Sequence, residues 1–495
     1  MRKTDILIIG TGIAGLSFAV KTASKRKDLS ITIMTKEKAE VSNTLHAQGG
    51  IAAVMDNLRD SFDQHINDTL KSGGGESDPK IVKMVVYQAP ERLQELIDLG
   101  MAFDKNKSDW DLALEGGHSQ PRILHHKDNT GFEIEKTLLE AVKRFENITI
   151  LEHHYVADLV TETDNCVGAW YFDDENVVRY IRAKVTVVST GGCGQIFKNT
   201  TNSPIATGDG VAIAHRAKAQ IQDMHYMQFH PTAMYEPDRN PSFLLSEALR
   251  GAGAHVVNEN GRRFLFSYDI NGELATRDIV SKAIVEELRK SGQKHAYLDC
   301  THLNIQKLQT HFESIYNYCK SKGINPSKHR IPIIPVAHYQ CGGITVNQHS
   351  QTTVNDLYAI GECARTGLHG KNRLASNSLL EALVFAHQAS VKVCDTIDDI
   401  SHSTTIYVNK FPVGSVAAST KKIDELKDNL KSVLEQYHID SAINKALLDI
   451  QHLKEIADSI FQTESISKPI TELINMLTVA TLIVEHSKNN ELVTF

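Results

Sequence analysis

Residues 5–15 read DILIIGTGIAG, and this stretch decides the fold. Its first half is a short apolar run rich in isoleucine, typical of a buried strand, and its second half places glycines at 10, 12 and 15. A helical pattern follows over 13–24 and a second short strand over 31–34. The order strand, tight turn, helix, strand predicts a βαβ unit and a doubly wound α/β fold.

The glycine-rich turn also predicts a bound dinucleotide. Glycines there let the backbone approach a pyrophosphate, which sits at the positive N-terminus of the helix. The expected contacts are Gly10, Gly12, Ile13, Ala14 and Gly15. The alternative is a turn that is merely rich in glycine. The acidic residue that binds a ribose hydroxyl about 20 residues further on is absent, which counts against a plain NAD dehydrogenase: the second strand ends at Thr35-Lys36, and Glu37 lies slightly late.

Composition narrows the classes of function. A chain of 495 residues is long enough for roughly two or three domains. A net charge of -7 gives no basic surface for nucleic acid, and the seven scattered cysteines form no Cys-x-x-Cys pair that would suit a metal centre. Glycines interrupt the apolar residues 6–20, so we do not interpret them as a secretory signal, and no apolar run reaches the roughly 18 residues that span a bilayer. We predict a cytoplasmic protein without a metal site or a membrane partner.

The nucleotide-binding fold is assembled from separated segments. Further buried strands are expected over 182–190 and 356–360, each followed directly by glycine. Residues 231–335 between them carry their own strands and amphipathic helices, and residues 421–484 have helical periodicity without glycine. We predict a discontinuous Rossmann-like domain, an inserted α+β capping domain and a C-terminal helical bundle, with the boundaries 1–229 and 340–405, 230–339, and 406–495.

A second glycine-rich segment covers residues 42–53, SNTLHAQGGIAA. On composition alone it is a surface loop, although its backbone donors could line a cofactor. Together with the first turn and Thr35-Lys36, its AQGG sequence resembles the flavoprotein family of succinate dehydrogenase, fumarate reductase and L-aspartate oxidase. Later segments of the chain resemble the FAD-contacting turns of that family in the same order: TGG at 190–192, ATGDG at 206–210 and YAIGE at 358–362.

The resemblance implies FAD as the cofactor. It assigns ribose or ribityl hydroxyls to Asp209 and Glu362, and it places the backbone N–H groups of Ser378 and Leu379 at the flavin ring, where reduction builds negative charge. The other implied contacts are Lys36, Asn43, Thr44, Ala47, Gln48, Gly49 and Gly50. Succinate dehydrogenases attach their flavin through a histidine four residues before AQGG. Asn43 occupies that position here, so the resemblance implies noncovalent FAD, while the neighbouring His46 has no assigned role.

Five further motifs resemble the dicarboxylate pocket of the family: QFHPT at 228–232, LSEALRG at 245–251, TRD at 276–278, AHY at 337–339 and GKNR at 370–373. Arginine offers a bidentate fork to a carboxylate, and histidine and hydroxyl groups add shorter-range donors. The resemblance implies that the substrate carboxylates are bound by His230, Ser246, His338 and Arg373. Each of these taken singly is more typical of a structural or surface residue.

Arg277 resembles the proton-transfer arginine of the family. Such a role requires an unusual site with other cations and little water, and we expect His230, Arg250 and Arg373 to supply that field. The alternative is a structural arginine that pairs with Asp278 at the start of a helix.

Glu115, in the LEGGHS sequence at 114–119, bears on the choice of substrate within the family. The respiratory enzymes resemble one another in carrying glutamine there, and a carboxylate pairs better with a substrate ammonium. The alternative is a surface glutamate before a glycine turn. The resemblance thus implies oxidation of L-aspartate to iminoaspartate with oxygen or fumarate as acceptor, which feeds quinolinate formation in NAD biosynthesis.

Other functions are consistent with parts of the sequence. The closest alternative is a soluble fumarate reductase or succinate-oxidising flavoprotein with the same carboxylate clamp. A non-enzymatic electron-transfer subunit would leave the polar pocket motifs without a purpose. In the expected pathway, quinolinate synthase is the metabolic neighbour. Residues 487–495 lack the Arg-Gly ending that we expect of aspartate oxidases.

Overall fold

The structure is a computed structural model that describes residues 2–56, 58–407, 411, 419–440, 442–463 and 466–489. It begins with the expected βαβ unit of β1 (Arg2–Ile9), α1 (Ile13–Lys25) and β2 (Ile31–Met34). The backbone N–H of Gly10 donates to the Met34 carbonyl at 2.8 Å, so the carboxyl ends of β1 and β2 lie side by side. The last residues of the atypical tail, 490–495, lie outside the described residues.

The main sheet has seven strands in the order β8-β2-β1-β11-β10-β9, with β18 also pairing with β11. Strands β8, β2, β1, β11 and β18 pair in parallel, whereas β10 and β9 extend the sheet antiparallel. The strands not yet given are β8 (Ile148–Leu151), β9 (Tyr155–Glu162), β10 (Asn165–Phe172), β11 (Val178–Val188) and β18 (Leu357–Ala359). Strands β11 and β18 confirm the two that the sequence predicts over 182–190 and 356–360.

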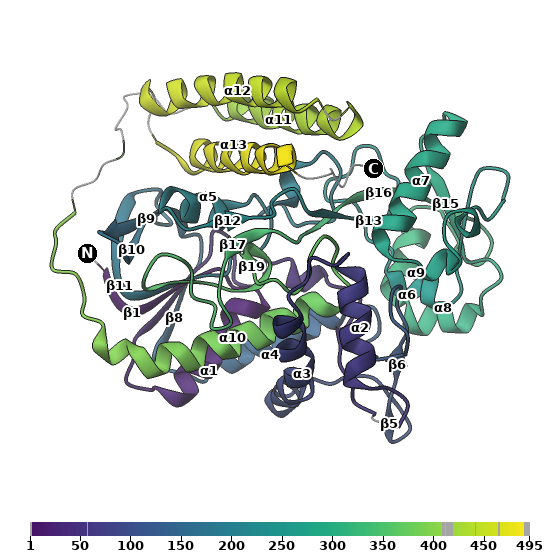
Figure 1. The fold of residues 1–495 in the computed structure, drawn as a ribbon, viewed down its shortest axis with the longest axis horizontal. Coiled ribbons are helices and arrows are strands. Elements are labelled where there is room, and N and C mark those ends of the chain that lie inside the picture. The colour runs from purple at the N-terminus through teal and green to yellow at the C-terminus, as the bar shows by residue number, and fades with distance from the viewer. Residues whose placement is uncertain are drawn as a thin grey trace.

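Helices cover one face of this sheet. Helix α1 packs against α4 and α10, and α3 packs beside them (Figure 1). The bounds of these helices are α3 (Pro79–Leu99), α4 (Thr130–Val142) and α10 (Asn377–Thr396), and α2 (Phe62–Ser72) packs against α3. Their apolar side chains form one core with the parallel strands.

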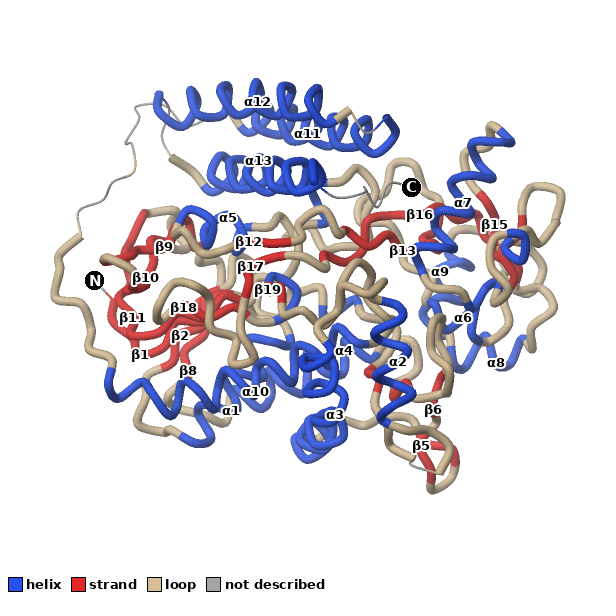
Figure 2. Tube along the Cα trace, in the orientation of Figure 1, coloured by secondary structure: helices blue, strands red, loops and turns tan. Residues whose placement is uncertain are grey.

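The inserted unit is built on an antiparallel sheet of four strands, β13-β16-β15-β14, and Figure 2 shows it set apart from the main sheet. Its strands are β13 (Met227–Met234), β14 (His255–Val257), β15 (Ala296–Asp299) and β16 (Ile331–Gln340). Its helices are α6 (Glu247–Gly251), α7 (Arg277–Ser291), α8 (Ile305–His311) and α9 (Glu313–Ser321). This unit has a hydrophobic core of its own, which includes Val256, Ile284 and Leu298.

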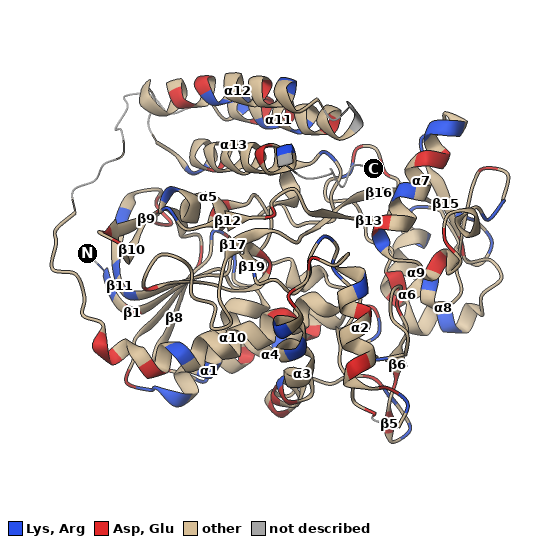
Figure 3. Cartoon of the chain, viewed as in Figure 1, with Lys and Arg blue, Asp and Glu red and all other residues tan. Residues whose placement is uncertain are grey.

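Three C-terminal helices complete the chain: α11 (Thr420–Asp440), α12 (Ile443–Thr463) and α13 (Lys468–His486). Positive and negative side chains are mixed along α11 and α12 (Figure 3). Helix α13 packs against α5 (Asp209–Arg216) of the nucleotide-binding fold. The expected class, an α/β fold with an inserted α+β unit and a C-terminal helical bundle, is confirmed.

The remaining elements are short. The strands are β3 (Ile51–Ala52), β4 (Lys105–Asn106), β5 (Asp109–Trp110), β6 (Leu112–Ala113), β7 (Ile123–Leu124), β12 (Ile221–Gln222), β17 (Gly343–Thr345) and β19 (Ala364–Arg365). The single-turn helices are η1 (Thr44–His46), η2 (Gly194–Ile196), η3 (Leu265–Ser267), η4 (Gly272–Leu274), η5 (Gly361–Cys363), η6 (Ile397–Asp399) and η7 (Ser487–Asn489). Among the described residues, no helix is both long and apolar enough to cross a membrane.

Candidate cofactor and substrate site

A cavity of about 450 Å³ extends from the carboxyl ends of the parallel strands to the inserted unit. Every residue that the sequence predicts for the site lines this cavity, with the exception of Gly15. The segment 42–53 contributes Asn43, Thr44 and the AQGG residues to the wall and continues into β3. The alternative of a surface loop is therefore wrong for this segment.

The structure shows why the turn after β1 contains glycine and how the turn contacts Thr44. A Cβ atom on Gly15 would lie 2.3 Å from the Gly10 carbonyl oxygen, so this glycine allows α1 to pack closely on β1 and does not line the cavity. The Ile13 N–H donates to the Thr44 side chain at 3.0 Å. The next N–H group belongs to Ala14, which lines the cavity where the helix dipole favours an anion such as a pyrophosphate.

Polar groups along the wall match a ligand with hydroxyl and amide groups. The Glu362 carboxylate accepts a hydrogen bond from the Gln340 N–H at 3.0 Å, and burial raises its pKa to about 7. The buried Oε1 of Gln48 has no hydrogen-bond partner within the part of the chain that the structure describes. Ser378 and Leu379 lie in the first turn of α10, as predicted, with the positive end of that helix at the cavity. These donors and acceptors fit a flavin dinucleotide.

Lys36 and Asp209, which the sequence predicts as separate cofactor contacts, bind each other. The Lys36 ammonium donates to an Asp209 carboxylate oxygen at 2.7 Å and to Glu472 of α13 at 2.8 Å. Glu472 is not predicted from the sequence, because no motif connects the C-terminal helices with the nucleotide fold.

Arg277 lies at the first position of α7 and points its guanidinium at two buried acceptors. Its Nε donates to Glu247 at 2.6 Å and its Nη1 donates to the Gln228 side chain at 2.9 Å. The alternative pairing with Asp278 is wrong, since Asp278 instead accepts a hydrogen bond from Asn372.

Glu247 connects two arginines, because its other carboxylate oxygen accepts a hydrogen bond from Arg250 at 2.5 Å. Burial opposes its charge, but Arg277 and Arg250 outweigh burial and lower its pKa, so Glu247 is ionised. Glu247 belongs to the LSEALRG motif at 245–251, but no role is predicted for it from the sequence. The signal was the spacing of three residues between Glu247 and Arg250, which brings opposite charges together on a helix.

Arg373 lies over the ring of Tyr339, with the guanidinium carbon 4.4 Å from the ring centroid, and donates to the Ser378 hydroxyl at 3.1 Å. Burial, followed by the nearby Arg277, lowers its pKa to about 10, so the guanidinium is still charged at neutral pH. Its buried Nε has no hydrogen-bond partner among the described residues. A substrate carboxylate in the cavity would accept the hydrogen bond that this N–H group can donate.

His230 and His338 face each other, with ring centroids 5.0 Å apart. Burial, together with the charge of Arg277, lowers the pKa of both rings well below the usual value, so both are neutral at neutral pH. The expectation that His230 adds a positive charge around Arg277 is therefore wrong. His230 Nδ1 accepts a hydrogen bond from the Thr232 N–H at 3.2 Å, which leaves its Nε2 as the protonated, donating nitrogen.

Glu115 is only 2% exposed, so the alternative of a surface glutamate is wrong. Its carboxylate accepts a hydrogen bond from the Ser376 hydroxyl at 2.5 Å. Burial and the neighbouring Glu247 raise its pKa. Ser246, also on the cavity wall, caps α6 by accepting a hydrogen bond from the Ala248 N–H at 3.3 Å.

Asn43 at the wall leads to a prediction about flavin attachment. Its side-chain oxygen accepts a hydrogen bond from the Ser203 N–H at 2.8 Å, and an amide cannot form the bond that the histidine of succinate dehydrogenases makes. We expect acid precipitation of the holoprotein to release all of the FAD into the supernatant. Flavin fluorescence that stays with the denatured chain would contradict this prediction and point to His46, which also lines the cavity.

Comparison with known proteins agrees with this geometry. Residues 5–379 match the family described as FAD binding domain. The chain is 40% identical over 459 residues to a chloroplastic L-aspartate oxidase of Nicotiana tabacum, covering 88% of this chain and 70% of that protein. It is 38% identical over 499 residues to the L-aspartate oxidase of Vibrio cholerae, covering 97% of this chain and 92% of the relative. The chain spans 61% of the length of the relatives from rice and Arabidopsis thaliana.

Among solved structures, a mutant of Escherichia coli quinol fumarate reductase superposes with a TM-score of 0.86. The two sequences are 28% identical, and the superposition covers 98% of this chain and 89% of the other. Such a superposition includes all three C-terminal helices as well as the inserted unit, so the whole arrangement belongs to one architecture.

Proposed function

Since the chain belongs to the L-aspartate oxidase family of FAD-binding flavoproteins, we propose that it oxidises L-aspartate to iminoaspartate. The observation that carries the choice of substrate is the buried carboxylate of Glu115, in the same cavity as Arg277 and Arg373. The Arg373 guanidinium and the polar groups around it suit two carboxylates, and the Glu115 carboxylate suits one ammonium. FAD supplies the two-electron acceptor for the hydride that leaves Cα.

The side chains of the pocket divide the work. Arg373, Ser246 and the neutral rings of His230 and His338 bind the two carboxylates, and Glu115 binds the ammonium. An ammonium has no lone pair with which to form the C=N bond, so one proton must leave the nitrogen before or as the hydride leaves Cα and the iminium forms. We assign that proton transfer to Arg277, whose guanidinium is held in place by the ionised Glu247 and by Gln228. A guanidinium ordinarily keeps its protons, so the transfer must be a relay in which it gives up one proton as it receives another.

The metabolic setting follows from the product. Iminoaspartate is a precursor of quinolinate, so we propose the first step of NAD biosynthesis, with oxygen or fumarate reoxidising the cofactor and quinolinate synthase as the next enzyme. We place the reaction in the cytoplasm, because the cysteines of the chain are free thiols. We also propose the domain boundaries 1–229 with 340–405, 230–339 and 406–495, supported by the separate core of the inserted unit.

Bleaching of the flavin absorbance under anaerobic conditions tests the substrate. We expect L-aspartate to bleach the bound flavin completely in one turnover and succinate to leave most of it oxidised. Rapid bleaching by succinate together with no bleaching by L-aspartate would instead identify a soluble succinate-oxidising flavoprotein or fumarate reductase.

Glu115→Gln tests the ammonium contact. The amide keeps the size of the side chain and removes the charge, so we expect L-aspartate to bind more weakly by roughly 1.5–3 kcal/mol, the cost of losing one charge-assisted hydrogen bond. Succinate affinity should change little. The dependence of the flavin reduction rate on L-aspartate concentration measures the first affinity, and difference spectra of the oxidised flavin measure the succinate affinity. Glu133→Gln on α4, outside the cavity, is the control, and equal losses for both ligands would show that Glu115 only supports the fold.

The raised pKa of Glu115 predicts a pH dependence. A carboxyl with a raised pKa takes up its proton at a higher pH than an ordinary glutamate, and the protonated form no longer pairs with an ammonium. The KM for L-aspartate should therefore rise as the pH falls through that raised pKa, while succinate affinity stays level. If the KM of Glu115→Gln rises in the same way at low pH, the titrating group is not Glu115.

A further inference from the structure

Lys36 forms an ion pair with Glu472 of the C-terminal helix α13. It follows β2, whose carboxyl end lies beside the glycine turn, where doubly wound folds hold the ribose of a dinucleotide. Besides Asp209 and Glu472, its ammonium donates to the Thr207 hydroxyl at 2.7 Å. Burial opposes the charge, but the carboxylates of Asp209 and Glu472 raise the pKa of Lys36 and keep it ionised.

Asp209, the partner of Lys36, also forms a hydrogen bond with α13. One carboxylate oxygen accepts hydrogen bonds from Lys36 and Thr207, and the other accepts them from Tyr155 and Asn475, both at 2.7 Å. The carboxylate thus has a fixed orientation at the cavity wall, and one of the groups that fix it comes from α13.

Asn475 has no freedom to adopt another role. It is completely buried, its oxygen accepts a hydrogen bond from Arg216 at 2.8 Å, and its NH₂ group donates to both Tyr155 and Asp209. A buried amide with every partner in place holds its neighbours rigidly, since any displacement would leave polar groups unpaired.

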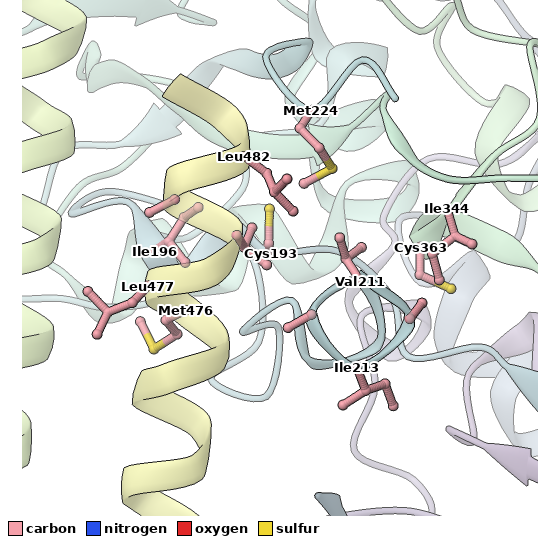
Figure 4. Close-up of a cluster of buried hydrophobic side chains, with 14 of the residues drawn as sticks. Cys193, Ile196, Val211, Ile213, Met224, Ile344, Cys363, Met476, Leu477 and Leu482 are labelled. Carbon is pink, nitrogen blue, oxygen red and sulfur yellow. The ribbon is translucent and has the colours of Figure 1, made fainter. Parts of the chain in front are cut away.

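Apolar packing sets the depth at which α13 sits. Figure 4 shows Met476 and Leu477 of α13 in the same buried cluster as Val211 and Ile213 of α5. Glu472, Asn475 and Val479 recur at helical spacing and so share the face that meets α5. At the start of α5, a Cβ on Gly208 would lie 2.8 Å from a methyl group of Val479, so a glycine there allows the close approach.

We propose that Glu472 and Asn475 are positioning residues of the FAD site, which hold Lys36 and Asp209 where these two contact the adenosine half of the cofactor. Helix α13 then supports the cofactor site from behind the cavity wall, although it lies beyond residues 5–379 that match the FAD binding domain family. The network is balanced in charge, because Lys427 of α11 donates to the second oxygen of Glu472 at 2.6 Å. The proposal rests on FAD binding and not on the identity of the substrate.

FAD titration of the apoprotein, followed by quenching of flavin fluorescence, tests this proposal in the full chain. We expect Asn475→Leu to raise the Kd for FAD at least about tenfold, the equivalent of one charge-assisted hydrogen bond. Glu472→Gln, at a partly exposed pair, should raise it about threefold. ADP, used as a competitor of FAD, should lose affinity by the same factors, because the network faces the adenosine half.

Two controls separate positioning from general damage. Thr471→Val removes a buried hydroxyl of α13 that donates to the Ser467 carbonyl one turn earlier, and Glu455→Gln removes an exposed charge of α12. Both should bind FAD like the unmodified chain. An unchanged Kd for FAD in Asn475→Leu, or an equal rise in Thr471→Val, overturns the proposal. Melting of the apoprotein shows whether Asn475→Leu folds. If it does not, Glu472→Gln is the test, and an unchanged Kd for both FAD and ADP in that variant overturns the proposal.

Discussion

Arg277→Leu should bind FAD and a dicarboxylate almost normally and lose turnover with L-aspartate by at least about 100-fold. That factor is the lower end for a positioned acid–base group. The fold should tolerate the change, because Glu247 keeps its ion pair with Arg250 and is not left as an isolated buried charge. Stopped-flow measurement of flavin reduction, with the FAD content of each preparation determined beforehand, gives the rate of the chemical step.

Arg277→Lys separates charge from geometry. Lysine keeps the positive charge but loses the planar fork that contacts Glu247 and Gln228 at once. We expect part of the fumarate reduction to return in this variant. Arg289→Leu, at the exposed end of the same helix, is the matched control. Near-normal rates of both aspartate oxidation and fumarate reduction in a fully loaded Arg277→Leu protein would mean that the residue is structural.

Local patterns predicted the parts of the fold that depend on neighbouring residues. The glycine turn predicted α1 and β2 almost to the residue, because turn geometry and apolar periodicity are both written within a few positions. The strands β11 and β18 were predicted one by one, each followed by glycine. Their parallel pairing across the inserted unit was not predicted from the sequence and is seen in the structure.

Long-range contacts were beyond sequence patterns. Lys36 and Glu472 are separated by 436 positions, and no periodicity relates a strand end to a C-terminal helix. The state of charge of a buried group was equally hidden. His230 and Glu247 stand in similar motifs, yet burial makes the histidine neutral while two arginines keep the glutamate ionised. The order of the motifs was enough to predict which residues line the pocket. The charge of each residue depends on the groups packed around it, which the motifs do not show.

Arg373→Met should weaken the binding of every dicarboxylate by about 3 kcal/mol or more, roughly a hundredfold in Kd, since a bidentate fork provides two charge-assisted hydrogen bonds. Methionine still packs on the Tyr339 ring, so the cavity keeps its shape. L-Aspartate, succinate and fumarate should lose affinity equally, in contrast to Glu115→Gln, because they share carboxylates and differ in the ammonium. Difference spectra of the oxidised flavin measure the Kd of succinate and of fumarate, and the dependence of the flavin reduction rate on L-aspartate concentration measures that of L-aspartate.

Arg373→Lys should recover only a small part of that affinity, because an ammonium provides the charge but not the paired N–H groups. Arg365→Leu is the matched control: it removes an arginine eight positions earlier that pairs with Asp223 and does not line the cavity. Arg373 also donates to Ser378 at the start of α10, so the FAD content must be measured for each variant. If fully loaded Arg373→Met binds dicarboxylates as tightly as the unmodified chain, the carboxylates are held by the other pocket residues, and Arg373 serves only to orient the end of α10.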